Sequence, residues 1–202
     1  MKKYSMIKTI VLLSSCLFFM TSVKAQVGFR AGVLISKQDF KNLENGGDVE
    51  SKLGADLALV FDIPSDNAVT FSPEIHWLQK GTKISNINGS VGESSRTFNY
   101  LEIPLMVKFH FGEGDTKFFL MGGPSLGYLL NGTDKDHDGQ TNDIDLDFYK
   151  RTEFGAHIGG GIAVGPVRFD LRYVLGLSNI FDDDTEVTIT NRGYGAGIAF
   201  MF

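Results

Sequence analysis

The residues best suited to bind a ligand lie in one acidic segment, Asp134–Asp145. Aspartates occupy its first, third and fifth positions, a glycine the sixth, a carbonyl ligand the seventh, and a carboxylate closes it at the twelfth. This spacing lets several oxygens converge on one hard cation such as Ca²⁺, while the glycine permits a sharp turn. The closing aspartate reaches less far than the usual glutamate, so we expect weak binding, and the alternative is a solvated acidic loop. The candidate ligands are Asp134, Asp136, Asp138, Gln140 and Asp145.

Two further patterns bear on catalysis. The segment Gly123–Gly127 has the spacing G-x-S-x-G, which exposes a nucleophilic serine when a helix follows the turn. No helical pattern follows Ser125, so we interpret its hydroxyl and the glycines as small groups inside a β-structure. Three histidines could gather around a metal or relay protons, but we favour hydrogen-bonded members of a polar interior. We therefore expect no enzyme activity and no cofactor beyond the weak Ca²⁺; the histidines are His76, His110 and His157.

Composition limits the class of protein. The chain has 202 residues with 24 Gly, 17 Phe and only 5 Pro, which suits one all-β domain of alternating small and aromatic positions. The net charge of -5 argues against a nucleic-acid partner. A single cysteine, Cys16, excludes an internal disulfide and a cysteine-based metal site.

The first 25 residues resemble a secretory signal peptide. A basic start precedes the apolar run Thr9–Val23, and Ala25 closes a small-residue cleavage site. We therefore expect residues 1–25 to be removed and residues 26–202 to form the mature domain. The alternative is a lipoprotein modified at Cys16, since Leu13–Cys16 resembles a lipobox. Cleavage there would leave an apolar stretch directly after the lipid, so we favour the signal peptide.

The mature chain divides into eight segments in which apolar and small or polar residues alternate. Such alternation predicts β-strands with one apolar face. Their even number, and the aromatic residue that ends the chain, predict an eight-stranded antiparallel up-and-down transmembrane β-barrel. The predicted strands are Val27–Ser36, Leu53–Ile63, Val69–Lys83, Tyr100–Phe111, Lys117–Leu130, Phe148–Val164, Val167–Gly176 and Gly193–Phe202.

The connections between these strands alternate in length. Tight turns are expected at Pro64–Asn67, Gly112–Asp115 and Gly165–Pro166. Long polar connections are expected at 37–52, 84–99, 131–147 and 178–190. Outer-membrane barrels have short periplasmic turns and long outer loops, so both termini should be periplasmic.

The inward face of the predicted strands carries charges of both signs. A narrow barrel can hold them if they pair with one another. The alternative is a soluble barrel with its faces reversed, which would put these charges in water and bind an apolar ligand. Asp62, Lys80 and Glu153 are expected to face inward, with the predicted polar network formed by Arg30, Asp56, Glu74, His76, Glu102, Lys108, His110, His157, Arg168, Asp170 and Arg172.

Several segments resemble the PorT-like outer-membrane β-barrel family. They are Phe71–Gly81 (FSPEIHWLQKG), Tyr100–Leu105 (YLEIPL), Gly122–Leu129 (GGPSLGYL) and Arg172–Ile180 (RYVLGLSNI). The resemblance covers nearly all of the mature chain and implies the fold and an outer-membrane location. It also implies a possible association with protein secretion, as in some family members, but it transfers no functional residue.

The sequence therefore predicts a small integral outer-membrane barrel of structural or interaction type. Its expected partners are outer-membrane lipid and, through the long loops, envelope or secretion proteins. Two alternatives stay open: an outer-membrane enzyme that modifies lipid, and a soluble periplasmic barrel that binds a ligand.

Overall fold

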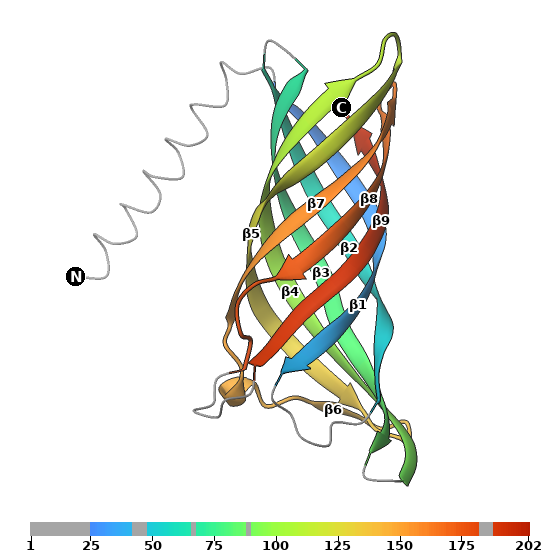
Figure 1. The fold of residues 1–202 in the computed structure, drawn as a ribbon, viewed down its shortest axis with the longest axis vertical. Helices are drawn as coiled ribbons and strands as arrows, with labels where there is room; N and C mark the ends of the chain where they lie inside the picture. Colours follow the sequence, from blue (N-terminus) through green and yellow to red (C-terminus); the bar gives the residue numbers. More distant parts are fainter. Residues whose placement is uncertain (1–24, 42–47, 66–67, 88–89, 182–187) are drawn as a thin grey trace, which may run out of the picture.

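The computed structural model describes residues 25–41, 48–65, 68–87, 90–181 and 188–202 (Figure 1). The expected signal peptide, residues 1–25, lies outside these ranges except for Ala25, so its cleavage stays a prediction. Within the described ranges, no helix is long and apolar enough to cross a membrane.

Eight long antiparallel strands form a closed barrel, as the sequence predicts (Figure 1). Each long strand pairs with its neighbours along the chain, and the last pairs with the first, from Gly28 opposite Met201 to Lys41 opposite Thr188. A ninth, short strand extends the sheet at one end, beside β5. The strands are β1 (Gln26–Lys41), β2 (Asp48–Pro64), β3 (Val69–Ile87), β4 (Ser90–Phe111), β5 (Thr116–Lys135), β6 (Thr141–Asp143), β7 (Thr152–Val164), β8 (Val167–Gly176) and β9 (Thr188–Met201).

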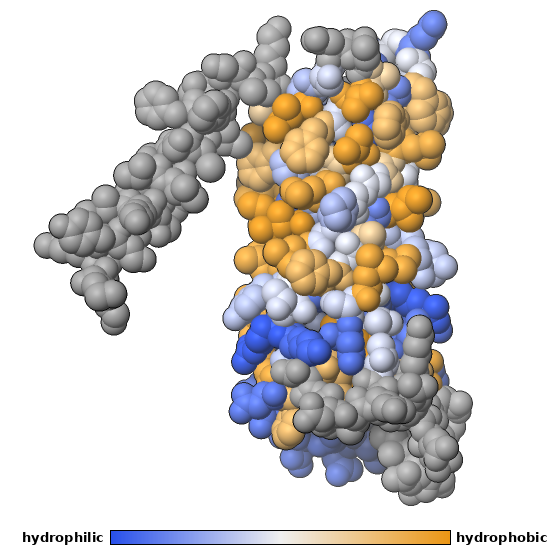
Figure 2. Space-filling view, turned by 60° about the vertical axis from the view of Figure 1, so that its left-hand side comes forward, coloured by the Kyte–Doolittle hydropathy of each residue, from blue (hydrophilic) through white to orange (hydrophobic). Residues whose placement is uncertain are grey.

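The two faces of the barrel differ in polarity. Large apolar side chains point outward, with Phe29 62%, Leu171 68% and Tyr194 71% exposed. Charged side chains point inward, and Glu74 and Arg30 are 0% and 3% exposed. On the face shown in Figure 2, apolar residues cover most of the barrel wall, and a polar zone follows toward the end with the long connections. A soluble barrel needs the opposite arrangement, so the soluble alternative is wrong.

Several strands are longer than predicted. The β3–β4 ladder continues from the apolar region out to Ile87 opposite Ser90, so most of the expected loop 84–99 is a hairpin. The alternation of apolar residues ends before the backbone pairing does. Sequence periodicity detects the alternation but not the pairing, so the strand ends were placed too early. The sixth strand is shorter than predicted because Phe148 belongs instead to a 3₁₀ turn, Leu146–Phe148 (η2).

Apolar layers close the interior on both sides of its polar middle. Toward the long-loop end, Phe98, Tyr100 and Leu129 are fully buried, with Ile144 and Tyr149 packed against them. Toward the short-turn end lie Met106, Phe119 and Met121. Most of the charged side chains in the polar middle are almost fully buried.

Candidate functional site

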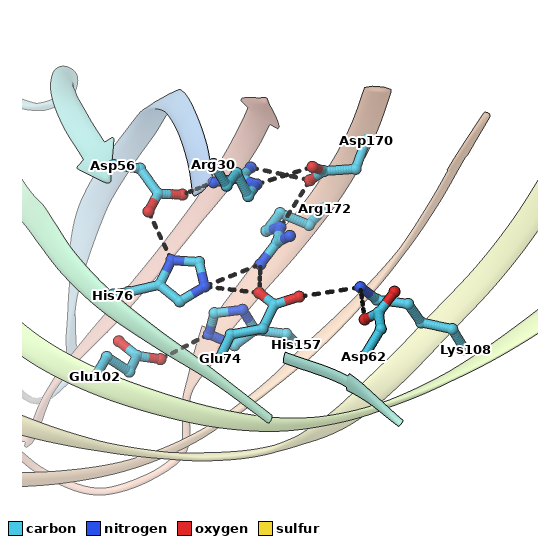
Figure 3. A network of polar contacts seen from close by, with 10 residues as sticks. All are labelled: Arg30, Asp56, Asp62, Glu74, His76, Glu102, Lys108, His157, Asp170 and Arg172. Carbon is cyan, nitrogen blue, oxygen red and sulfur yellow. Dashed lines mark hydrogen bonds and ion pairs between the residues drawn. The ribbon is translucent and has the colours of Figure 1, made fainter. Parts of the chain in front are cut away.

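The polar centre of the barrel is built around Arg30 of β1 (Figure 3). Its guanidinium forms a two-pronged ion pair with Asp170 of β8, with Nε donating to Oδ2 at 2.8 Å and Nη2 donating to Oδ1 at 2.9 Å. Its Nη1 also donates to Asp56 of β2. Arg30 therefore connects strands on both sides of the junction between the first and last strands.

His76 of β3 lies between two carboxylates. Its Nδ1 is 2.6 Å from Asp56 Oδ1, and its Nε2 is 2.7 Å from Glu74 Oε2. Each ring nitrogen therefore lies within hydrogen-bond distance of a carboxylate. Among the described residues, the interior holds five basic side chains and six carboxylates besides the histidines, which are Arg30, Lys80, Lys108, Arg168 and Arg172 with Asp56, Asp62, Glu74, Glu102, Glu153 and Asp170.

Arg172 and Lys108 extend this cluster. Arg172 donates from Nε to Asp170 Oδ1 at 2.8 Å and from Nη1 to Glu74 Oε2 at 2.9 Å. Lys108 Nζ lies 3.4 Å from Glu74 Oε1 and donates to Asp62 at 3.1 Å. Arg168 also forms an ion pair with Asp62, closer to the short-turn end. Each charge thus has an opposite partner, which buried charges require.

A second cluster is centred on Lys80. Its Nζ lies 2.7 Å from Glu102 Oε2 and 2.9 Å from Glu153 Oε2. His157 Nε2 lies 2.6 Å from Glu102 Oε1, and its ring lies 6.2 Å from that of His76. The two clusters therefore meet at the histidine pair.

Tyr100 and Asn191 complete this second cluster. Neither residue was among those predicted for the polar network. Tyr100 is fully buried, 4.9 Å from Lys80 Nζ to its ring centre, and Asn191 donates to its hydroxyl at 3.4 Å. Tyr100 lies two residues before Glu102 in the same predicted strand. This spacing puts both side chains on one face, so the sequence could have indicated that Tyr100 points inward.

Inward glycines make room for the long side chains. A Cβ at Gly197 of β9 would collide with the Arg30 guanidinium, which crosses over this residue to reach Asp170. A Cβ at Gly195 would press on Arg172 Cγ at 3.1 Å. The small residues of the last strand are therefore required by the arginines of its neighbours.

The structure brings all but two of the predicted network residues into these clusters. Arg168 lies at their edge, paired with Asp62. His110 is half-buried near the short-turn end, and its ring contacts Phe119 at 5.8 Å between centres. The histidines therefore do not gather as a metal site.

The five candidate Ca²⁺ ligands are not brought together. Asp134 accepts hydrogen bonds from Ser94 Oγ at 2.6 Å and Arg96 Nε at 3.2 Å. Asp136 accepts from Asn142 in the β5–β6 hairpin, and Asp145 caps η2. No group of three or more acidic, histidine or cysteine residues in the described ranges is placed to hold a metal ion. Cation binding by this segment stays a sequence-based prediction without a preformed site.

Ser125 lies in β5, in the middle of a strand, and is buried. The G-x-S-x-G spacing therefore has no strand-to-helix turn behind it. Both deeply buried histidines instead bond to carboxylates. In the described residues these histidines therefore belong to the charge-paired interior, and neither is paired with Ser125.

A closed barrel with an apolar exterior and a charge-paired interior is the architecture of an outer-membrane protein. Residues 21–182 match the sequence model described as outer membrane protein beta-barrel domain. The chain belongs to this family. No curated protein sequence matches the chain.

Several solved structures are similar to this chain at low sequence identity. Neisserial surface protein A is 14% identical with a TM-score of 0.47, over 88% of this chain and 99% of that one. Ail, the attachment invasion locus protein of Yersinia pestis, is 16% identical with a TM-score of 0.42, over 87% and 99%. The outer membrane enzyme PagL is 10% identical with a TM-score of 0.47, over 84% and 98%. At this level of similarity they carry no argument about function.

Proposed function

We propose that this barrel is a non-conducting outer-membrane protein of structural or interaction type, which presents its extended hairpins outside the membrane. The observation that carries this proposal is the filled interior. Paired charges occupy its middle, and apolar layers with fully buried Phe98, Leu129 and Met106 lie on either side. Moving an ion through would require breaking buried ion pairs, each of which is costly to separate.

The outer ends of the strands are the natural contact surface. β3 and β4 are 19 and 22 residues long, against roughly 9–11 residues for a strand that only spans a bilayer. Their excess length projects at the long-loop end (Figure 1). We propose envelope or secretion proteins as the partners, and membership of the PorT-like group, on the strength of the sequence segments that resemble it.

The orientation we propose puts both ends of the mature chain in the periplasm. The C-terminal residue lies at the end of the barrel with the short turns, and Gln26 at the start of β1 pairs with Asp62 near that end (Figure 1). Short turns face the periplasm in outer-membrane barrels. The lipid-modifying enzyme is not our proposal, because in the described part of the chain Ser125 lies in the middle of strand β5 and not at an exposed turn.

Two measurements test the proposal. Refolded protein in planar bilayers should give no stepwise conductance, and discrete open levels would contradict a filled interior. In cells, photo-cross-linking groups at the projecting hairpin should capture envelope proteins, whereas the same groups at Gly114 in a short turn should not. If both positions capture the same proteins equally, the hairpin is not the contact surface.

A further inference from the structure

The ladder between β1 and β2 ends before either strand does. Its outermost pair is Ser36 opposite Lys52. Beyond this pair β1 continues to Lys41 and is paired with β9, whereas β2 from Asp48 to Ser51 is paired with β3. Within the described ranges, each of these two outer segments therefore has a strand on one side only. The barrel wall is split at its long-loop end, and the ends of β1 and β2 lie apart there (Figure 1).

A β-bulge in β2 explains why the two strands separate. The register between β2 and β3 shifts between Ser51 and Asp56, and such a shift bends the strand that contains it. At the same level, the Ser36 hydroxyl of β1 donates to the Gly81 carbonyl of β3 at 3.2 Å and accepts from the Gly81 N–H at 2.9 Å. A side chain of β1 thus reaches across to β3 where the β1–β2 ladder stops.

The register also shows which backbone groups of β1 point into the split. The Phe202 N–H donates to the Val27 carbonyl at 2.8 Å, so this opposite pair is hydrogen bonded. Hydrogen-bonded pairs alternate with other pairs in an antiparallel ladder, so the odd-numbered residues of β1 bond to β9. The even-numbered residues direct their N–H and C=O groups toward β2. For Gln38 and Phe40, which lie beyond the last pair with β2, the described part of the chain places no strand opposite.

This unpaired edge begins where the apolar surface ends. The outermost apolar pair of the β1–β2 ladder is Ile35 opposite Leu53, with these side chains 49% and 63% exposed. Farther out on β1, Asp39 forms an ion pair with Arg192 of β9. Unpaired backbone groups are not tolerated in hydrocarbon, so an open edge is expected only beyond it. In water such an edge is a template for a further strand.

The shape of the barrel limits what can reach the edge. The β3–β4 hairpin projects well beyond the end of β1 (Figure 1). A second copy of the barrel would carry the same projecting hairpin beside its own edge, and the two hairpins hinder the approach of one edge to the other. A single extended segment needs only the spacing of one strand, about 4.8 Å from β1. The edge is therefore suited to a lone extended segment.

We propose that the outer edge of β1, residues 37–41, accepts an extended segment of a partner protein as an added strand. The main chain of that segment would bond to the backbone groups of Gln38 and Phe40. In this mode of recognition, main-chain hydrogen bonds supply the affinity. The inference rests on the proposed interaction function and specifies how a partner is held.

The test compares two variants at one position. Phe40→Pro removes the N–H that points away from β9, whereas Phe40→Ala removes the ring and keeps the N–H. The probe is a fluorescent peptide of alternating threonine and valine with a lysine at each end. Its binding to refolded protein in detergent is measured by fluorescence anisotropy. Unchanged heat-dependent mobility in electrophoresis shows that each variant is folded.

We expect Phe40→Pro to bind the peptide at least about fivefold more weakly than the unmodified protein, since one hydrogen bond contributes about 1 kcal/mol net. Phe40→Ala should stay within about twofold of the unmodified protein. Equal binding by the two variants, or no binding of the peptide to the unmodified protein, would overturn the proposal. A cross-linked dimer of the barrel that is lost in Phe40→Pro would assign the edge to a second copy and exclude the partner segment.

Amide hydrogen exchange tests the edge without any substitution. In the unmodified protein, the amides of Gln38 and Phe40 should exchange faster than those of Lys37 and Asp39, which bond to β9. The peptide should slow the two fast amides. If all four amides are equally protected without the peptide, the edge is already covered and cannot accept a strand.

Cross-linking in cells separates this inference from the proposed function. If groups at the β3–β4 hairpin capture the same envelope proteins in Phe40→Pro as in the unmodified protein, the proposed function stands and the edge is not what holds the partner. If the peptide binds the edge as expected but the hairpin captures no protein, the strand-accepting edge is supported and the proposed function is contradicted.

Discussion

Replacing Asp170 with asparagine should destabilise the barrel strongly. Asp170 accepts three hydrogen bonds from two arginines, at 2.8, 2.9 and 2.8 Å. Asparagine keeps the shape but removes the charge, and its amide NH₂ faces donors. Breaking a buried ion pair on one side costs about 3–5 kcal/mol. Arg30 retains Asp56 and Arg172 retains Glu74, so we expect the lower end, about 3 kcal/mol.

Urea unfolding of protein refolded into lipid vesicles measures this loss. The chain has a single tryptophan, so Trp77 on the outer face of β3 reports the transition without ambiguity. A loss of about 3 kcal/mol should lower the urea midpoint by about 1 M or more, given slopes of about 1–3 kcal/mol/M.

Asp39→Asn provides the matched control. Asp39 forms a 2.6 Å ion pair with Arg192, but these side chains are 27% and 42% exposed, so the loss should stay below about 1 kcal/mol. Equal midpoint shifts for Asp170→Asn and Asp39→Asn would refute the view that the interior network stabilises the fold.

Three further predictions concern other parts of the barrel. Gly197→Ala should lower the free energy of unfolding by about 1–3 kcal/mol in the same urea assay, because the added Cβ meets the Arg30 guanidinium. The control is Gly122→Ala, whose added Cβ has its nearest contact at 3.5 Å and should have little effect. Equal losses for the two variants would exclude a collision with Arg30. Leu171→Arg on the lipid face should cost about 2–4 kcal/mol in vesicles, and an unchanged midpoint would put that face outside the bilayer. Burial raises the pKa of Tyr149 at the barrel mouth. The packing of this tyrosine should therefore be intact below its ordinary pKa of about 10 and be lost as pH rises through the higher folded pKa, in a tyrosinate absorbance titration. Titration at the ordinary value would contradict its burial.

The barrel itself could be predicted from the sequence because two independent signals agree. Within each strand, the alternation of apolar and polar residues indicates which face of the sheet each side chain is on. Between strands, the alternation of short and long connections indicates which strands form hairpins at each end of the barrel. The outer ends of the strands could not be predicted, since Lys83 and Ser95 pair in the ladder although the apolar alternation has ended there. Pairing depends on backbone groups, which every residue carries.

Which residues face inward could also be predicted, but not which of them pair. Arg30 and Asp170 are 140 residues apart and meet only after the barrel closes. The Asp134–Asp145 spacing suggested converging carboxylates. In the structure the β5–β6 hairpin turns at Gly139 and directs Asp134 toward Arg96 instead. Spacing along the chain is informative about a ligand set only when the backbone conformation is known.

The ion pair across Gly197 has a consequence for how the barrel enters its membrane. Arg30 belongs to the first strand and Asp170 to the second last, so this pair can form only when β9 is already docked between them. An unclosed sheet would present both charges to lipid, which costs several kcal/mol for each group. Insertion strand by strand is therefore unfavourable, and closure and burial must occur nearly together. Docking of the last strand is then the step that commits the chain to assembly, and Gly197 variants should accumulate as unclosed chains outside the bilayer.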